Sequence, residues 1–154
     1  LTLEIPSAYH IAKSQEDFYW IRKPLKSGHT NIIIYQVPLQ TIPQDSTALQ
    51  AIINMRDTLA SKQLPVEDGA KFITEQAYTP YITATTIDGK FAFETKGTWE
   101  IQNQWMAGPF VNYSVRDTIN NRYLVLEGFT YAPSSSKRDL QLELESILKS
   151  VKIK

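Results

Sequence analysis

The chain has 154 residues, in which 16 Lys and Arg residues balance 16 Asp and Glu residues, so its formal net charge is zero. It contains no cysteine, which excludes thiol nucleophiles, disulfides and cysteine-ligated zinc sites. Without net charge or a basic run, it lacks the long-range field that drives binding to nucleic acids. We therefore expect no nucleic-acid partner. The length fits a single domain over residues 1–154.

The N-terminal third predicts strands followed by a helix. Apolar and polar residues alternate over residues 1–6, which predicts a first strand, and the apolar runs at 18–22 and 30–37 predict a hairpin. From residue 47 to residue 62 the apolar side chains fall at helical spacing. Thr47 and Gln50 have the form of a capping box at the start of this helix.

The second half predicts long antiparallel strands. Over residues 90–102 apolar and small side chains share one face of a strand, and charged side chains share the other. Asn120-Asn121 predicts a tight turn between strands at 110–118 and 122–131, because asparagine tolerates positive φ. The Ala107-Gly108-Pro109 run predicts another turn.

The chain ends in an amphipathic helix, whose cap is predicted at Ser136 and whose apolar side includes Leu144, Ile147 and Leu148. Consecutive strands with short links are antiparallel, so the fold class is α+β. We expect a sheet of about six to eight strands with two main helices packed on it. At the level of the fold, the opening strand and the last helix resemble PsbP or Mog1-like domains.

Few residues offer catalytic or metal-binding chemistry. The two histidines, His10 and His29, are predicted in a loop or at a strand edge, outside any catalytic motif, so we predict no metal site and no cofactor. Glu94 and Glu100 share a strand face with Lys96 between them. The default interpretation is a solvated face with ion pairs, and the alternative is the acid and base of a hydrolase.

Two features suggest binding. Arg56 falls on the apolar stripe of the first predicted helix, where an ion pair between helix and sheet is expected and an anion-binding role is the alternative. Trp99, Trp105, Met106 and Phe110 gather around the predicted Gly-Pro turn. Such a cluster forms either a corner of the core or an exposed surface that binds an apolar group or a sugar.

The sequence also resembles a family of Bacteroidetes envelope lipoproteins that share a domain of unknown function of the DUF4837 type. The resemblance rests on Trp20-Ile21-Arg22, Ile33-Ile34-Tyr35, Arg56-Asp57, Thr74-Glu75, Lys96-Gly97-Thr98-Trp99-Glu100, Met106-Ala107-Gly108-Pro109-Phe110, Glu127-Gly128-Phe129-Thr130-Tyr131-Ala132-Pro133, Lys137-Arg138 and Leu144-Glu145. The chain departs from the family at Lys96, where the family has Arg, and at Ala107, where it has Gly. These departures weaken any site carried over from the family.

The resemblance implies export to the cell envelope and a lipid anchor on a cysteine outside these residues, which would be the only attachment to a membrane. It also implies that residues 1–154 are the C-terminal part of a longer protein. It implies no activity.

Our first hypothesis is a non-catalytic envelope module that binds a glycan, a lipid or a protein through the cluster from Trp99 to Phe110. The alternatives are a hydrolase that uses Glu94 and Glu100, and a structural spacer domain.

Overall fold

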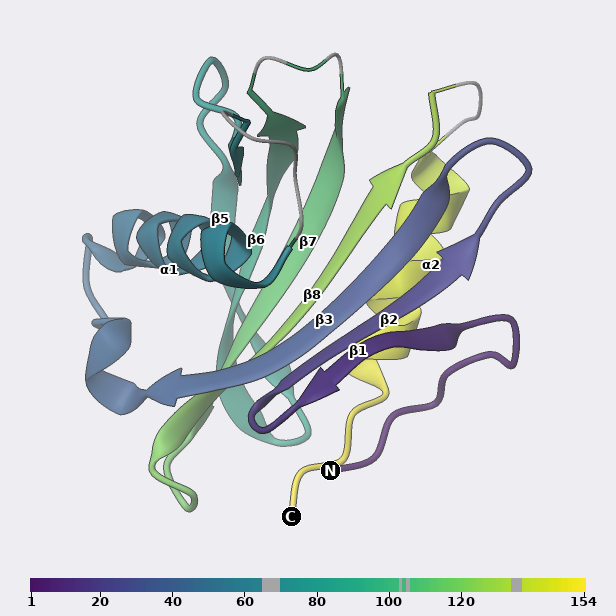
Figure 1. Ribbon diagram of the computed structural model, residues 1–154. Coiled ribbons are helices and arrows are strands. Elements are labelled where there is room, and N and C mark those ends of the chain that lie inside the picture. The colour runs from purple at the N-terminus through teal and green to yellow at the C-terminus, as the bar shows by residue number, and fades with distance from the viewer. Residues whose placement is uncertain (65–69, 103, 105, 134–136) are drawn as a thin grey trace.

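A computed structural model describes residues 1–64, 70–102, 104, 106–133 and 137–154. Within these residues, eight antiparallel strands form one curled sheet that resembles half a barrel (Figure 1). The order across the sheet is β1-β2-β3-β8-β7-β6-β4, and β5 pairs with β6 on the same edge as β4. The strands are β1 (His10–Gln15), β2 (Phe18–Pro24), β3 (His29–Pro38), β4 (Phe72–Thr74), β5 (Tyr81–Ile87), β6 (Lys90–Ile101), β7 (Met106–Asp117) and β8 (Arg122–Tyr131).

One helix packs on each face of the sheet: α1 (Ala48–Gln63) on one side and α2 (Arg138–Lys149) on the other (Figure 1). A short 3-10 helix, η1 (Leu39–Thr41), leads from β3 toward α1. The predicted α+β class, with an antiparallel sheet and two main helices, is confirmed. No helix in the described part of the chain is long and apolar enough to span a membrane.

Helix α1 begins and ends within one residue of the prediction, but the predicted capping box is wrong. The Thr47 side chain does not cap the helix. Its backbone N–H, 2.8 Å from Oδ1 of Asp45, and its hydroxyl both donate to that carboxylate oxygen. Gln50 instead donates to the side chain of Asn54, 2.9 Å away on the next turn. The Asp45 carboxylate therefore accepts from the Thr47 N–H and hydroxyl, the two groups that the predicted capping box would have used.

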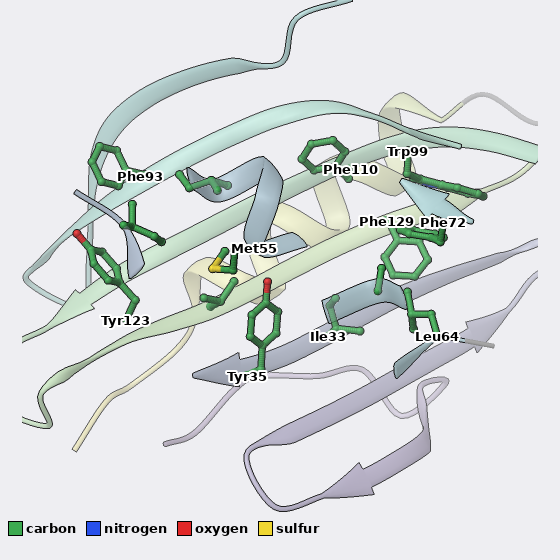
Figure 2. Packing of buried hydrophobic residues seen from close by; sticks show 14 of the residues in the cluster. Ile33, Tyr35, Met55, Leu64, Phe72, Phe93, Trp99, Phe110, Tyr123 and Phe129 are labelled. Carbon is green, nitrogen blue, oxygen red and sulfur yellow. The ribbon is translucent and has the colours of Figure 1, made fainter. Parts of the chain in front are cut away.

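The sheet separates two hydrophobic cores, because alternate side chains of each strand point to opposite faces. On the α1 face, Figure 2 shows Phe72, Trp99 and Phe129 grouped beside Leu64 at the end of α1. On the α2 face, the core includes side chains of β7, β8 and α2. Eight consecutive residues of β8 are buried, since this central strand is covered on both faces. The predicted division of residues 90–102 into two faces is confirmed by the burial of Phe93 and Trp99.

The N-terminal strand predicted over residues 1–6 is wrong. Thr2 makes only an isolated bridge to Lys152, with backbone hydrogen bonds of 2.9 and 2.8 Å, so the two ends of the chain lie side by side (Figure 1). Leu3 and Ile5 pack against the core on the α2 face, which explains their alternation without strand pairing. The first strand is β1, which follows this segment.

The β7–β8 hairpin is confirmed, and Asn121 has the positive φ, 56°, that its turn requires. The turn predicted at residues 107–109 is wrong, because these residues belong to β7. Pro109 pairs with Thr98 of β6, whereas the pairing of β7 with β8 begins only at Phe110. A proline is tolerated there because its missing N–H removes no bond to β8. The cap predicted at Ser136 lies outside the described residues.

Candidate functional site

A cavity of about 120 Å³ opens on the α1 face of the sheet, beside the C-terminal end of α1. We call it the aromatic cavity; it is lined by Trp20, Arg22, His29, Leu64, Phe72, Trp99, Ile101, Met106 and Phe129. Apolar cavities of about 150 Å³ bind benzene in other proteins. The aromatic cavity therefore accommodates a ring or a short chain.

The aromatic walls come from strands far apart in the sequence but adjacent in the sheet. Phe72 of β4 stacks on Trp99 of β6, with ring centroids 5.1 Å apart and planes 11° apart. Phe129 of β8 meets both rings edge-on, at 5.3 and 5.8 Å (Figure 2). Stacked and edge-on pairs at these distances stabilise each other beyond their buried area. The wall is therefore a rigid surface already formed in the folded chain.

Trp99 is held in place by the backbone of β8. Its indole N–H donates to the carbonyl oxygen of Thr130, 3.1 Å away. A Cβ atom added to Gly108 would lie 1.9 Å from this oxygen and 3.0 Å from the indole nitrogen. Only glycine allows the strands and the indole to approach this closely.

The other wall is a chain of hydrogen bonds through Asn31. The indole N–H of Trp20 donates to Oδ1 of Asn31 over 2.9 Å, and Nδ2 of Asn31 lies 2.7 Å from Nδ1 of His29. Because an indole nitrogen and an amide nitrogen only donate, Nδ1 of His29 accepts, and the neutral ring carries its proton on Nε2. Burial, and then the charge of Arg22, lowers the pKa of His29 to about 4. The ring is therefore neutral at neutral pH.

Arg22 and His29 also line an open groove of about 330 Å³ on the β1–β2–β3 side. We call it the histidine groove; its lining is His10, Ile11, Ala12, Arg22, Pro24, Gly28 and His29. Arg22 and His29 line both spaces, so they stand where the aromatic cavity meets the groove. Among the described residues, no Asp or Glu lines either space, and no group of three or more potential ligands could hold a metal ion.

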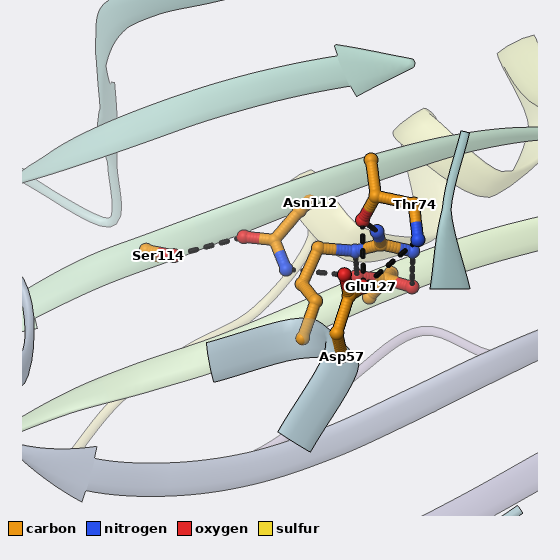
Figure 3. Close-up of polar contacts among 6 residues, drawn as sticks. Asp57, Thr74, Asn112, Ser114 and Glu127 are labelled. Carbon is orange, nitrogen blue, oxygen red and sulfur yellow. Dashed lines mark hydrogen bonds and ion pairs between the residues drawn. The ribbon is translucent and has the colours of Figure 1, made fainter. Parts of the chain in front are cut away.

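A second polar cluster lies deeper on the same face, where α1 crosses the sheet (Figure 3). Nε and Nη2 of Arg56 donate to the two carboxylate oxygens of Glu127 over 2.5 and 2.9 Å, and Nη1 donates to the Thr74 hydroxyl. The Thr74 hydroxyl and N–H in turn donate to Oδ1 of Asp57, each over 2.8 Å. Asn112 donates to Glu127 over 2.9 Å. This set is the buried network.

The buried network confirms the predicted ion pair between helix and sheet. Burial opposes the charge of Arg56, but Glu127 more than offsets this, so the pKa of Arg56 is raised. The guanidinium carbon also lies 3.5 Å from the centroid of the Phe110 ring. Nε, Nη1 and Nη2 of Arg56 all have partners within the protein, so the network contributes rigidity and offers a ligand little.

Comparison with known proteins gives a family match and a similar crystal structure. A family described as a domain of unknown function (DUF4837) matches residues 1–150. The chain belongs to the DUF4837 family. The crystal structure of LpqN, described as involved in cell envelope biogenesis of Mycobacterium tuberculosis, is similar with a TM-score of 0.54 and 12% sequence identity. The match covers 97% of this chain and 80% of the LpqN chain, and it shows a shared fold. No curated protein sequence matches significantly.

The structure of this DUF4837 domain separates the residues that the sequence had grouped. Trp99 and Met106 line the aromatic cavity, whereas Phe110 packs against Arg56 of the buried network. Trp99 and Phe110 are each only 1% exposed. Trp105 lies outside the described residues. The predicted binding cluster is therefore split between a cavity wall and a closed core.

Glu94 and Glu100 do not form a pair. They are six residues apart on β6, roughly 20 Å along the strand, whereas the two carboxylates of a glycosidase are about 5–10 Å apart. Glu94 accepts a hydrogen bond from the Tyr113 hydroxyl over 2.7 Å and lies 3.9 Å from Lys96. Burial, and then Glu94, raises the pKa of Tyr113. This geometry gives the hydrolase hypothesis no support.

Sequence reasoning missed Trp20, Arg22, His29, Phe72 and Phe129. One signal was available: within the predicted hairpin, Trp20 and Arg22 are two positions apart and so share a face. His29 was interpreted as an ordinary edge residue because its partner Asn31 gives no motif. The two phenylalanines could be placed only by the order of strands in the sheet.

Another depression, of about 480 Å³, lies between β3 and α1. Its lining is Tyr35, Val37, Thr41, Ala51, Asn54, Met55, Thr58, Leu59 and Lys62. It is larger, but it follows the seam between helix and sheet and has a single charged side chain, Lys62. The aromatic cavity combines apolar walls with convergent polar groups, which is the usual character of a small-ligand site.

Proposed function

We propose that this chain is a non-catalytic binding module of the cell envelope, whose ligand places an apolar group in the aromatic cavity. The observation that carries the proposal is the open cavity walled by Trp20, Phe72, Trp99 and Phe129. Large rings offer contact area with little loss of conformational entropy. A preformed cavity with these walls favours binding without requiring a rearrangement.

The hydrogen bonds of the walls favour an apolar group over a sugar ring. The indole N–H groups of Trp20 and Trp99 are both already bonded to protein oxygens. Leu64, Ile101 and Met106 complete the lining with apolar surface. Burying sugar hydroxyls against such a surface would leave them without partners. Among the glycan, lipid and protein ligands that the sequence suggested, a lipid-like group fits best.

The envelope location is part of the same proposal. It is supported by the similarity in fold to LpqN, which is described as involved in cell envelope biogenesis, and by the resemblance of the sequence to envelope lipoproteins. We propose that the protein is exported and that a lipid anchor outside these residues attaches it to a membrane.

Filling the cavity tests the binding role. Ile101→Trp places a large ring in the cavity, and Ile119→Trp makes the same change at a side chain that is 81% exposed in the β7–β8 turn. The probe is 1-hexanol, with binding followed by NMR and folding checked by circular dichroism. We expect Ile101→Trp to weaken binding at least about tenfold and Ile119→Trp to match the wild type.

Equal affinity in both variants would reject the cavity as the site. If Ile101→Trp disturbs folding, the wild type alone decides. 1-Hexanol must then shift the signals of Phe72, Trp99 and Phe129, and shifts confined to other regions would reject the proposal.

A structural spacer is the second candidate function, favoured by the burial of Trp99 and Phe110. Two of the aromatic residues that the sequence suggested for binding serve the core. This candidate predicts that 1-hexanol leaves the signals of the cavity walls unchanged at all concentrations, so the same titration separates the two functions.

A further inference from the structure

The mouth of the aromatic cavity carries uncompensated positive charge. Resting on the proposed binding role of this cavity, we propose that the ligand is a single-chain amphiphile with an anionic head. Arg22 binds its carboxylate or phosphate between the aromatic cavity and the histidine groove, and its apolar chain enters the cavity.

The sheet brings Arg22 together with both histidines along the histidine groove. In the strand register Arg22 lies opposite His10 of β1 and Asn31 of β3, and Pro24 lies opposite His29. Residues directly opposite each other share a face of the sheet. The chain contains only two histidines, and both line the groove with Arg22.

Arg22 differs from Arg56 and Arg122, which each pair with a carboxylate. Arg56 pairs with Glu127 at 2.5 Å, and Arg122 pairs with Asp117 at 3.0 Å. Arg22 is partly buried and forms no ion pair in the described part of the chain. Arg116 of β7 also lacks an ion pair there, but its Nη1 donates to the Tyr123 hydroxyl over 3.4 Å. The Arg22 guanidinium carbon lies 5.6 Å from the centroid of the Trp20 ring, which orients it beside the cavity wall. A planar guanidinium binds carboxylate or phosphate through paired hydrogen bonds.

His29 adds a donor at the same place. Nδ1 of its ring accepts from Asn31, so Nε2–H is left as the donor of the neutral ring. No carboxylate among the described lining residues would repel an anion. A neutral or cationic head group would leave Arg22 without a counter-charge, whereas an anion satisfies it.

The size of the cavity determines the chain length of the probe compounds. A space of about 120 Å³ suits a six-carbon chain, so head groups are compared on one hexyl chain. The series is hexanoate, hexyl phosphate, 1-hexanol and hexylamine, with acetate and inorganic phosphate as heads without the chain. We expect the two anionic hexyl compounds to bind at least about tenfold more tightly than 1-hexanol and than the bare anions, with hexylamine weakest.

Arg22→Gln removes the charge at the mouth, and Arg116→Gln makes the same change at the far end of β7. We expect Arg22→Gln to erase the preference for hexanoate over 1-hexanol, and Arg116→Gln to keep the preference. If Arg22→Gln fails to fold, the wild type still decides, because hexanoate must shift the Arg22 Nε–H signal and 1-hexanol must not.

The outcomes separate this inference from the proposed function. Equal affinity for hexanoate and 1-hexanol, or a preference that survives Arg22→Gln, would overturn the anionic head but keep the apolar cavity. Acetate binding as tightly as hexanoate would overturn the amphiphile. Absence of binding by every hexyl compound would overturn the proposed function itself.

Discussion

Arg56 and Arg22 lie on the same face of the sheet, each against an aromatic ring, but only Arg56 has a carboxylate partner in the described structure. Arg56 lies 3.5 Å from the Phe110 ring and is enclosed by Glu127 and its neighbours. Arg22 lies 5.6 Å from the Trp20 ring, at the junction of two open spaces, and has no carboxylate partner in the described structure. A buried charge compensated inside the protein stabilises the fold, and a partly exposed charge left uncompensated is available to a ligand. Variants in the two regions test this division.

The largest effect is expected in the buried network. Arg56→Met leaves Glu127 buried without a counter-charge, so the free energy of unfolding should fall by about 3–5 kcal/mol. The double variant Arg56→Met/Glu127→Leu removes both charges and should recover most of this loss. Urea denaturation measures both. A double variant as unstable as the single one would show that the network stabilises by more than charge compensation.

The turn beside the mouth comes next. Gly28 has φ +111°, and an added Cβ would lie 1.9 Å from the carbonyl oxygen of Tyr131. Gly89 has φ +75° with no atom within 4 Å of an added Cβ, so it serves as the matched control. Gly89→Ala should cost about 1–2 kcal/mol for its backbone alone, and Gly28→Ala should cost about 1–3 kcal/mol more. Equal losses of stability in the two variants, measured by thermal denaturation, would show that the β2–β3 hairpin adjusts at Gly28 and does not hold the His29 side chain in position.

Each of the two regions contains a buried asparagine, and replacing each one tests the two regions separately. Asn31 joins Trp20 to His29, and Asn112 joins Glu127 to Ser114, whose hydroxyl donates to it over 2.8 Å. Replacing either by Leu leaves polar partners unsatisfied, which should cost about 1–3 kcal/mol of stability. Only Asn31→Leu should also weaken hexanoate binding, as measured by NMR titration. Loss of binding in Asn112→Leu alone would reverse the assignment.

The smallest effect is the pH dependence that His29 contributes. Its pKa is about 4 in the folded chain, below the ordinary value of 6.5. Between these values the unfolded chain binds more protons, so the free energy of unfolding falls as the pH falls from 6.5 toward 4, and the contribution is fully present above pH 6.5. His29→Asn should reduce this fall, measured as the change in Tm between pH 7 and pH 4.5. An unchanged fall would show that the ring titrates as in the unfolded chain.

Local patterns predicted much of the fold. The alternation in β6, the helical spacing in α1 and the Asn120-Asn121 turn each report a structure formed by neighbours in sequence, and each is confirmed. The position of Arg56 on an apolar stripe also predicted its ion pair, because a charge there needs a partner. Pro109 misled the prediction, since its strand pairs on one side only at that position.

The aromatic cavity could not be predicted in the same way. It joins side chains of β2, β4, β6 and β8, and the strand order depends on the long-range pairing of β3 with β8. Asn31 and Phe129, for example, are paired across 98 residues. No local pattern encodes such a contact. The sequence identified Trp99 and Met106 as notable, but their neighbours in the cavity required the structure.

The most direct test of an anion-binding aromatic cavity is an NMR titration of the uniformly labelled wild type with hexanoate. We expect shifts of the Trp20 and Trp99 indole N–H signals and of Arg22 Nε–H, with the Arg56 and Glu127 region unchanged. Shifts confined to the buried network, or no shift at the cavity walls, would contradict this expectation.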